Sequence, residues 1–480
     1  MSVQSTTPAF LFQPRPDCSV SVAFDGGTIS SDGGCLLLAE VDQRLHLLDR
    51  LAACFRDYRD PELIEHSVGE LVRQRVYGIA LGYEDLNDHD HLRLDPLLAV
   101  LVGKSDLTGQ SRLRVQDRGK ALAGKSTLNR LELTPPEATA AHRYKKIVAR
   151  PEQIDRLLLD LFVEAHATAP EQIVLDCDAT DDPLHGHQEG RFFHGYYREY
   201  CYLPLYLFCG EHLLCARLRT AEHGEAAGAL EELVRVITAL RSVWPQVRIL
   251  VRGDSAFARE EIMAWCETHG VDYLFGLAKN SRLVEMLAGE LAMAHARYLS
   301  TGVAARVYAE LRYRTRDSWS RERRVVGKAE WMDKGANPRF VVTSLTLAAW
   351  PTAALYEKDY CARGEMENRI KEQKEGVASD RTSTGQLRAN QLRLYWASLA
   401  YVLLSGLRRL GLAETALARA QCGTVRNCLL KIGALVKVAA QRLRVSLSSA
   451  WPWQEVFAQA YARLQQLPVR LALPAGVNAS

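Results

Sequence analysis

The chain has 480 residues, of which 48% are hydrophobic and 24% are charged, and its formal net charge is +3. This balance is typical of a folded globular protein and excludes an intrinsically disordered chain. The length predicts a central domain with additions at both ends, because single cores seldom grow this large.

The first segment, residues 1–150, is predicted to hold a hairpin followed by helices. Residues 20–24 and 35–38 are apolar runs that flank two Gly-rich turns, which favours a hairpin. Helical periodicity follows over about 45–102. Residues 101–150 hold eleven Lys and Arg against four Asp and Glu, so we expect this segment to bind DNA.

Residues 119–126, Gly-Lys-Ala-Leu-Ala-Gly-Lys-Ser, fit the phosphate-binding P-loop pattern G-x4-G-K-[ST]. That loop requires a buried strand directly before it, yet residues 111–118 are charged and contain no hydrophobic run. We therefore predict an ordinary basic helix that starts at Ser126, with the serine hydroxyl as its N-cap.

From residue 172 the pattern changes to strands, and we expect residues 151–302 to form the first part of a catalytic core. Ile173, Leu175 and Cys177 alternate with Val174, Asp176 and Asp178, so one strand face carries two acids. A later strand ends at Asp254. The expected strands are 172–178, 202–209, 213–218, 247–251 and 273–277, with helices over 226–244, over 259–269 and from 281. Their order is that of the ribonuclease-H-like fold.

Three further segments complete the predicted organisation: a β-rich basic insertion at 303–346, a helix completing the core at 347–385, and a helical region at 386–480. Residues 301–339 hold ten Lys and Arg against five acids, and 401–445 hold eight against one. Together with 101–150 these windows carry +19 and leave −16 for the rest. Three basic segments suit a polyanion ligand, but three solvated helix faces explain the charges equally well.

The strongest motif is Y-x2-R-x3-E-x6-K, formed by Tyr360, Arg363, Glu367 and Lys374. In a regular α-helix, at about 100° per residue, these four side chains share one stripe. One carboxylate among a phenol, a guanidinium and an ammonium suits a metal ligand flanked by phosphate-binding groups. The alternative is a solvent-exposed helix face with i, i+4 ion pairs.

Three further motifs accompany this one: Leu-Asp-Cys-Asp-Ala-Thr at 175–180, His-Gly-His-Gln-Glu-Gly at 185–190 and Arg-Gly-Asp-Ser at 252–255. With these four motifs the chain resembles DDE transposases of the insertion sequence 1380 family. The likeness spans about residues 170–375. It implies an α/β fold, with a ribonuclease-H-like catalytic core, a β-rich insertion and helical flanking segments.

The resemblance also implies the site. Asp178, Asp254 and Glu367 would be the catalytic, metal-binding acids, while Tyr360, Arg363 and Lys374 would contact DNA phosphates. Phosphodiester transfer needs one metal to activate the nucleophile and another to stabilise the leaving oxygen. Mg²⁺ prefers carboxylate oxygens, and Mn²⁺ is the alternative cofactor.

Neighbouring residues offer alternatives for parts of this site. Asp176 competes with Asp178 because both lie on one strand face, and only Asp178 begins the D-x-T motif. Asp181 and Asp182 are expected to cap a turn. Three histidines lack further zinc ligands, so we interpret them as polar residues near the mouth of the site: His185, His187 and His194.

The resemblance implies an enzyme that cuts at the ends of an insertion sequence and joins the 3′ ends to target DNA. Its partner would be double-stranded DNA, at the ends and at the target. Both ends must be cut in concert, which implies a homodimer in the synaptic complex. The alternatives are a ribonuclease-H-like nuclease without strand transfer, or a DNA-binding protein whose acids are idle.

The eleven cysteines form no C-x-x-C pair, which indicates small core residues in a reducing cytosol. The N-terminus shows no secretory signal, and the longest apolar stretch, 394–407, is too short to span a bilayer. We therefore expect a cytoplasmic protein.

Overall fold

A computed structural model describes residues 10–15, 17–439 and 442–468. The chain divides into two compact units, Met1–Ala149 with Leu399–Ser480, and Arg150–Ser398. None of the described helices is long and apolar enough to cross a membrane.

The unit Arg150–Ser398 holds the predicted core. Its strands are β6 (Gln172–Ala179), β7 (Asp182–Pro183), β8 (Phe192–His194), β9 (Glu199–Tyr202), β10 (Leu205–Cys209), β11 (His212–Arg217), β12 (Arg248–Gly253), β13 (Asp272–Leu277), β14 (Ala305–Tyr313), β15 (Arg323–Met332), β16 (Gly335–Ala336) and β17 (Arg339–Thr343). Its helices include α7 (Pro151–Glu164), α8 (Ala229–Val243), α9 (Glu260–Thr268), α10 (Ser281–Met286) and α11 (Ala288–Thr301).

The central sheet of this unit has the strand order β11-β10-β6-β12-β13. Strands β6, β12 and β13 are parallel, whereas β10 is antiparallel to both β6 and β11. Three antiparallel strands followed by two parallel ones, with α8 and α9 as crossovers, are the ribonuclease-H-like topology. The predicted fold class is therefore confirmed.

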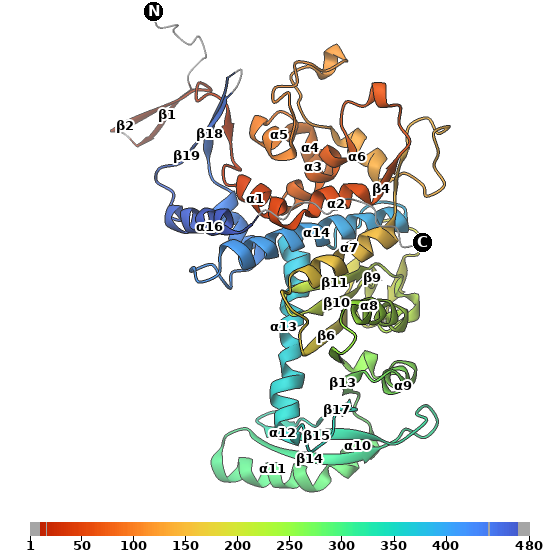
Figure 1. Ribbon diagram of the computed structural model, residues 1–480. Helices are drawn as coiled ribbons and strands as arrows, with labels where there is room; N and C mark the ends of the chain where they lie inside the picture. The colour runs from red at the N-terminus through yellow and green to blue at the C-terminus, as the bar shows by residue number, and fades with distance from the viewer. Residues whose placement is uncertain (1–9, 16, 440–441, 469–480) are drawn as a thin grey trace, which may run out of the picture. The chain divides into compact units, whose positions relative to one another are not determined.

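The β-rich insertion extends this same sheet. Strand β17 pairs antiparallel with β13, and β15 and β14 follow it outward. Helix α11 lies along β14 and β15 (Figure 1). These strands lie within the segment predicted as a β-rich insertion, and they lengthen the central sheet at the edge of β13 instead of forming a sheet of their own.

Apolar side chains cover both faces of the sheet. Leu175 and Val251 face a large core shared with α8 and α9, which includes Leu233 and Met263. Leu250 and Leu274 point the other way and pack against Leu355, at the start of a helical segment. That segment comprises α12 (Thr352–Ala354), the π-helix η6 (Leu355–Tyr360), the 3-10 helix η7 (Cys361–Arg363), α13 (Gly364–Lys371) and the π-helix η8 (Glu372–Gly376), and we call it the signature helix.

The other unit is mainly helical. Its elements include β1 (Phe10–Arg15), β2 (Cys18–Val22), β3 (Ile29–Ser30), α1 (Leu36–Leu45), α2 (Leu47–Ala53), β4 (Phe55–Asp57), α3 (Val68–Ala80), α4 (His89–Leu92), α5 (Pro96–Val102), α6 (Lys125–Glu132), β5 (Ile147–Ala149), α15 (Cys422–Val425), β18 (Ala434–Ala439), β19 (Arg442–Leu447) and α16 (Gln454–Gln466). Helix α14 (Leu387–Gly411) is shared between the two units along the chain.

Two predictions for this unit are wrong. Strand β2 pairs with β1, whereas residues 36–38 begin helix α1, because Leu37, Leu38 and Val41 are buried at helical spacing. The C-terminal region is not wholly helical: β18 and β19 form a hairpin in which Val436 pairs with Val445. Alternating β-branched residues favour strands there.

Candidate active site

Two of the predicted acids lie at the ends of neighbouring parallel strands. Asp178 is near the end of β6, and Asp254 follows β12 directly. Because Gly253 is level with Cys177 in the strand register, Asp254 is level with Asp178 at the same sheet edge. Asp254 also accepts a hydrogen bond from the Ala256 amide at 2.9 Å, which fixes the turn after the strand.

Arg363 joins the third acid to the first. Its Nη1 lies 3.1 Å from Oδ2 of Asp178, and its Nη2 lies 2.6 Å from Oε1 of Glu367. A cavity beside this bridge is lined by both acids together with Thr180, Lys374 and Asp380. The signature helix therefore brings Glu367 to the strand end that carries Asp178.

The electrostatics of Asp178 reflect this crowding. Burial raises the pKa of Asp178 to about 7, Arg363 opposes this shift, and the charges of Asp254 and Glu367 add to it. A cation near the three carboxylates would relieve their repulsion. Arg363 supplies such a charge for two of them.

The donor set fits a hard divalent ion, since carboxylate oxygens are its preferred ligands. In the described part of the chain, no three His, Cys, Asp or Glu side chains converge closely enough to hold an ion as they stand. Asp178 and Glu367 instead both form ion pairs with the guanidinium of Arg363, whose positive charge offsets their negative charges. A bound ion would require Arg363 to turn aside.

Asp176, the alternative to Asp178, is engaged elsewhere. It is 5% exposed, and both of its oxygens accept hydrogen bonds from Arg252, from Nε at 2.5 Å and from Nη2 at 2.8 Å. The two residues are register partners on β6 and β12, and Arg252 also donates to the backbone oxygen of Asp359. This geometry favours Asp178 as the acid available to a ligand.

The other signature residues lie on either side of Glu367. A Cβ at Gly276 would lie 2.6 Å from the Tyr360 hydroxyl and 2.9 Å from the Ser255 backbone nitrogen, so a larger residue there would displace the Tyr360 ring or the turn after β12. Lys374 donates from Nζ to the backbone oxygen of Asp181 at 3.0 Å. We predicted a regular α-helix here, whereas the segment contains π and 3-10 turns, which change the angle between successive side chains. Glu367 and Lys374 still line the same cavity.

Sequence reasoning missed two residues near the acids. Burial raises the pKa of Glu225, and the nearby charge of Asp254 raises it further. Burial likewise raises the pKa of Tyr197, with added effects from Glu225, Asp181 and Asp178. Both residues lie in loops without periodic pattern, so no signal in the sequence marked them. His194 packs 5.1 Å from Tyr197, ring centre to ring centre, which places it near the same acids.

Asp182 does not cap an exposed turn as predicted. It forms β7, pairs in register with Tyr202, and is 1% exposed. Burial raises the pKa of its carboxyl well above the usual range. His185 and His187, in contrast, are exposed.

The P-loop pattern does not fold as a P-loop. A 3-10 helix over Val115–Asp117 precedes it in place of a strand. Helix α6 begins at Lys125 with Gly124 as its N-cap, so Ser126 is not the cap that we predicted. The Asp90 carboxylate accepts the Lys125 amide at 3.0 Å and lies 3.4 Å from its Nζ, where an anionic ligand would have to lie.

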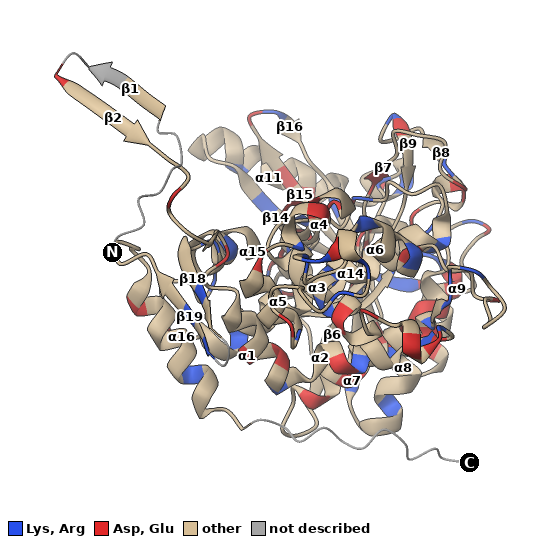
Figure 2. Ribbon diagram, turned by 90° about the horizontal axis from the view of Figure 1, so that it is seen from above, with Lys and Arg blue, Asp and Glu red and all other residues tan. Residues whose placement is uncertain are grey.

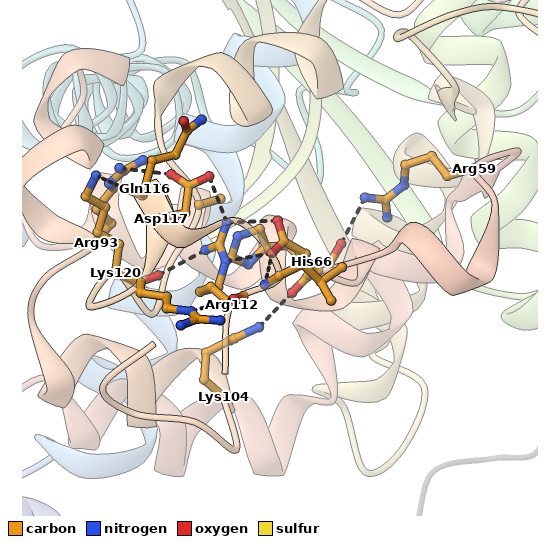
Figure 3. A network of polar contacts seen from close by, with 12 residues as sticks. Arg59, His66, Arg93, Lys104, Arg112, Gln116, Asp117 and Lys120 are labelled. Carbon is orange, nitrogen blue, oxygen red and sulfur yellow. Dashed lines mark hydrogen bonds and ion pairs between the residues drawn. The ribbon is translucent and has the colours of Figure 1, made fainter. Parts of the chain in front are cut away.

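The basic segments are partly neutralised within the chain, and Figure 2 shows Lys and Arg interspersed with Asp and Glu on many elements. Arg112 binds both carboxylate oxygens of Glu65, each at 3.1 Å (Figure 3). Burial and then the charges of Lys104, Arg112, Arg59 and Arg93 lower the pKa of His66 to about 3. Arg59, Arg93, Lys104 and Arg112 therefore lie close enough to His66 to disfavour its charged form.

The chain matches a family model and is similar to solved structures. A family model described as Transposase DDE domain group 1 matches residues 12–469. No curated protein matches the chain. Among solved structures, a piggyBac transposase synaptic complex with hairpin DNA is similar with a TM-score of 0.41 and 10% identity, over 92% of this chain and 83% of that one.

Proposed function

The chain belongs to the family described as Transposase DDE domain group 1, and we propose that it cuts DNA at the ends of an insertion sequence and joins the 3′ ends to target DNA. The observation that carries this proposal is the meeting of Asp178 and Glu367 on one guanidinium, beside the strand end that carries Asp254. The motifs at 175–180, 185–190 and 252–255 favour the insertion sequence 1380 family.

Asp178, Asp254 and Glu367 would hold two divalent ions, Mg²⁺ or Mn²⁺, which supply nucleophile activation and leaving-group stabilisation when bound. The basic residues of the signature helix would bind the DNA. Arg363 neutralises the acids in the free protein, and its guanidinium would turn to a DNA phosphate when ions replace it. Lys374 would exchange Asp181 for a second phosphate, and Tyr360 would contact a further phosphate near the element's end.

The test is to incubate the protein with duplexes of the element's ends and a supercoiled target plasmid in Mg²⁺. Plasmid joined to the 3′ ends of the duplexes would support a transposase. Nicked duplexes without joined plasmid would support the nuclease alternative instead. Binding to the duplexes without either product would indicate that the acids are idle.

A further inference from the structure

A hairpin close to the acids exposes several aromatic rings. It consists of β8 and β9, joined by a tip at residues 195–198. The exposed fractions are 44% for Phe192, 49% for Phe193, 81% for Tyr196 and 43% for Tyr200. On its inner side Tyr197 packs against the buried residues Cys201, Leu203 and Ala221, so the hairpin is held in place while these rings stay in solvent. Exposed apolar clusters of this kind mark binding surfaces.

The rings form a surface with charge on it. Phe193 and Tyr200 are register partners, with ring centres 5.5 Å apart at 74°. The Arg191 guanidinium lies 4.4 Å from the centre of the Tyr200 ring. At the tip, Tyr196 meets Tyr197 edge to face at 5.0 Å. Edge contacts leave ring faces open, and aromatic faces next to guanidinium groups are what unpaired nucleic-acid bases stack on.

The hairpin is braced against the core. Strand β9 pairs with β7, which begins four residues after Asp178. The Tyr202 hydroxyl donates to the Glu189 backbone oxygen at 2.5 Å, and the Glu189 carboxylate accepts the Leu387 amide at 3.0 Å. Strand β10 begins three residues after β9 ends and pairs with β6, with Tyr206 level with Asp178, so the hairpin leaves the sheet beside this acid. A strand at the acids would therefore pass the hairpin.

We propose that this hairpin binds unpaired DNA bases next to the phosphate that is cut, by stacking them on its exposed rings. The inference rests on the proposed function and extends it to a specificity for frayed or unpaired ends. Arg198 at the tip and Arg191, directly before β8, complement a phosphate backbone. DNA therefore suits this surface better than an apolar protein partner does.

The experiment compares binding to two duplexes of the element's end, one blunt and one with a short unpaired end, by fluorescence anisotropy. The double variant Phe193→Leu with Tyr200→Leu keeps apolar bulk and charge but removes two rings. We expect it to lose about tenfold or more in affinity for the unpaired end, since each stacked base contributes about 1–3 kcal/mol, and to bind the blunt duplex as the parent does. Phe193→Tyr with Tyr200→Phe should keep the parent's preference.

Two controls keep the result interpretable. Tyr461→Leu changes a tyrosine that is 50% exposed outside this unit and should leave both affinities unchanged. Tyr196→Leu deletes a ring that is 81% exposed at the tip, and we expect it to weaken binding to the unpaired end only. The inference would be overturned if the double variant Phe193→Leu with Tyr200→Leu and the variant Tyr196→Leu both kept the parent's preference for the unpaired end. It would also be overturned if these variants lost the same affinity for both duplexes. Cleavage of the blunt duplex by the parent, lost in Asp178→Asn, tests the proposed function separately.

Discussion

Individual residues at the site differ in what surrounds them, and this separates their expected roles. Asp176 and Asp178 are two positions apart on one strand, yet Asp176 is closed off by Arg252, whereas Asp178 borders a cavity. The D-x-T motif selected Asp178 from the sequence, but the partner of Asp176 was not predictable. It depends on the register between β6 and β12, which local sequence does not encode.

Asp176→Asn should therefore damage the fold. It leaves the Arg252 guanidinium buried without its carboxylate, which costs about 3–5 kcal/mol of stability. We expect a clear fall in melting temperature, whereas Asp178→Asn should melt no lower than the parent. Thermal denaturation followed by circular dichroism measures both. An Asp176→Asn protein with the parent's stability would show that this ion pair is not structural.

The pKa of Asp178 predicts a pH-dependent affinity for Mg²⁺. At about 7 it lies above the usual value, so the carboxyl is mostly protonated at pH 6 and mostly ionised at pH 8. Metal ligation requires the ionised form, so the affinity should fall about tenfold from pH 8 to pH 6. Calorimetric titration with Mg²⁺ at both pH values measures this. Equal affinity at both, or an unchanged profile in Asp178→Asn, would contradict the assignment.

At the scale of elements, the signature helix shows what a pattern can and cannot predict. The Y-R-E-K spacing predicted a helix that carries all four residues, and the resemblance to the transposase family implied that Glu367 approaches the two aspartates. The π turns at Leu355–Tyr360 and Glu372–Gly376 did not, because they depend on packing against the sheet. Single π turns often occur at functional sites.

The signature helix should divide its work between charge and chemistry. Arg363→Ala and Lys374→Ala should weaken binding to end DNA and reduce the salt dependence by about one unit of slope per lost phosphate contact. Glu367→Gln should bind as tightly as the parent or more tightly, because it removes a negative charge near those phosphates. Gel-shift titrations across salt concentrations separate the two classes. If both alanine variants bind end DNA with the parent's affinity and salt dependence, Arg363 and Lys374 serve only as ion-pair partners within the protein.

At the scale of the whole molecule, the sequence predicted the catalytic core better than the flanks. Alternating apolar residues and strand-end acids identified the core strands from 172 to 277, and parallel strands require both faces to be buried. The flanks fold through long-range contacts. Strand β3 pairs with β18, more than 400 residues later, and Gly34 packs on the backbone at Leu429. Neither contact has a local signal.

Each chain carries one set of Asp178, Asp254 and Glu367, and an element has two ends. We therefore expect two chains to assemble with two end duplexes before joining. Sedimentation velocity with labelled duplexes should show a complex of that composition, and its formation should persist in Glu367→Gln. A complex of one chain with one duplex, active in joining, would contradict the dimeric assembly.

The most direct test of the account is strand cleavage at the element's end in Mg²⁺ by the parent, Asp178→Asn, Asp254→Asn, Glu367→Gln and the control Glu365→Gln. Glu365 is exposed on the same helix, two residues from Glu367, and matches it in charge. The account predicts that the three site variants lose cleavage while still binding end DNA, and that Glu365→Gln cleaves as the parent does. Cleavage at the parent's rate by any of the three site variants would contradict it.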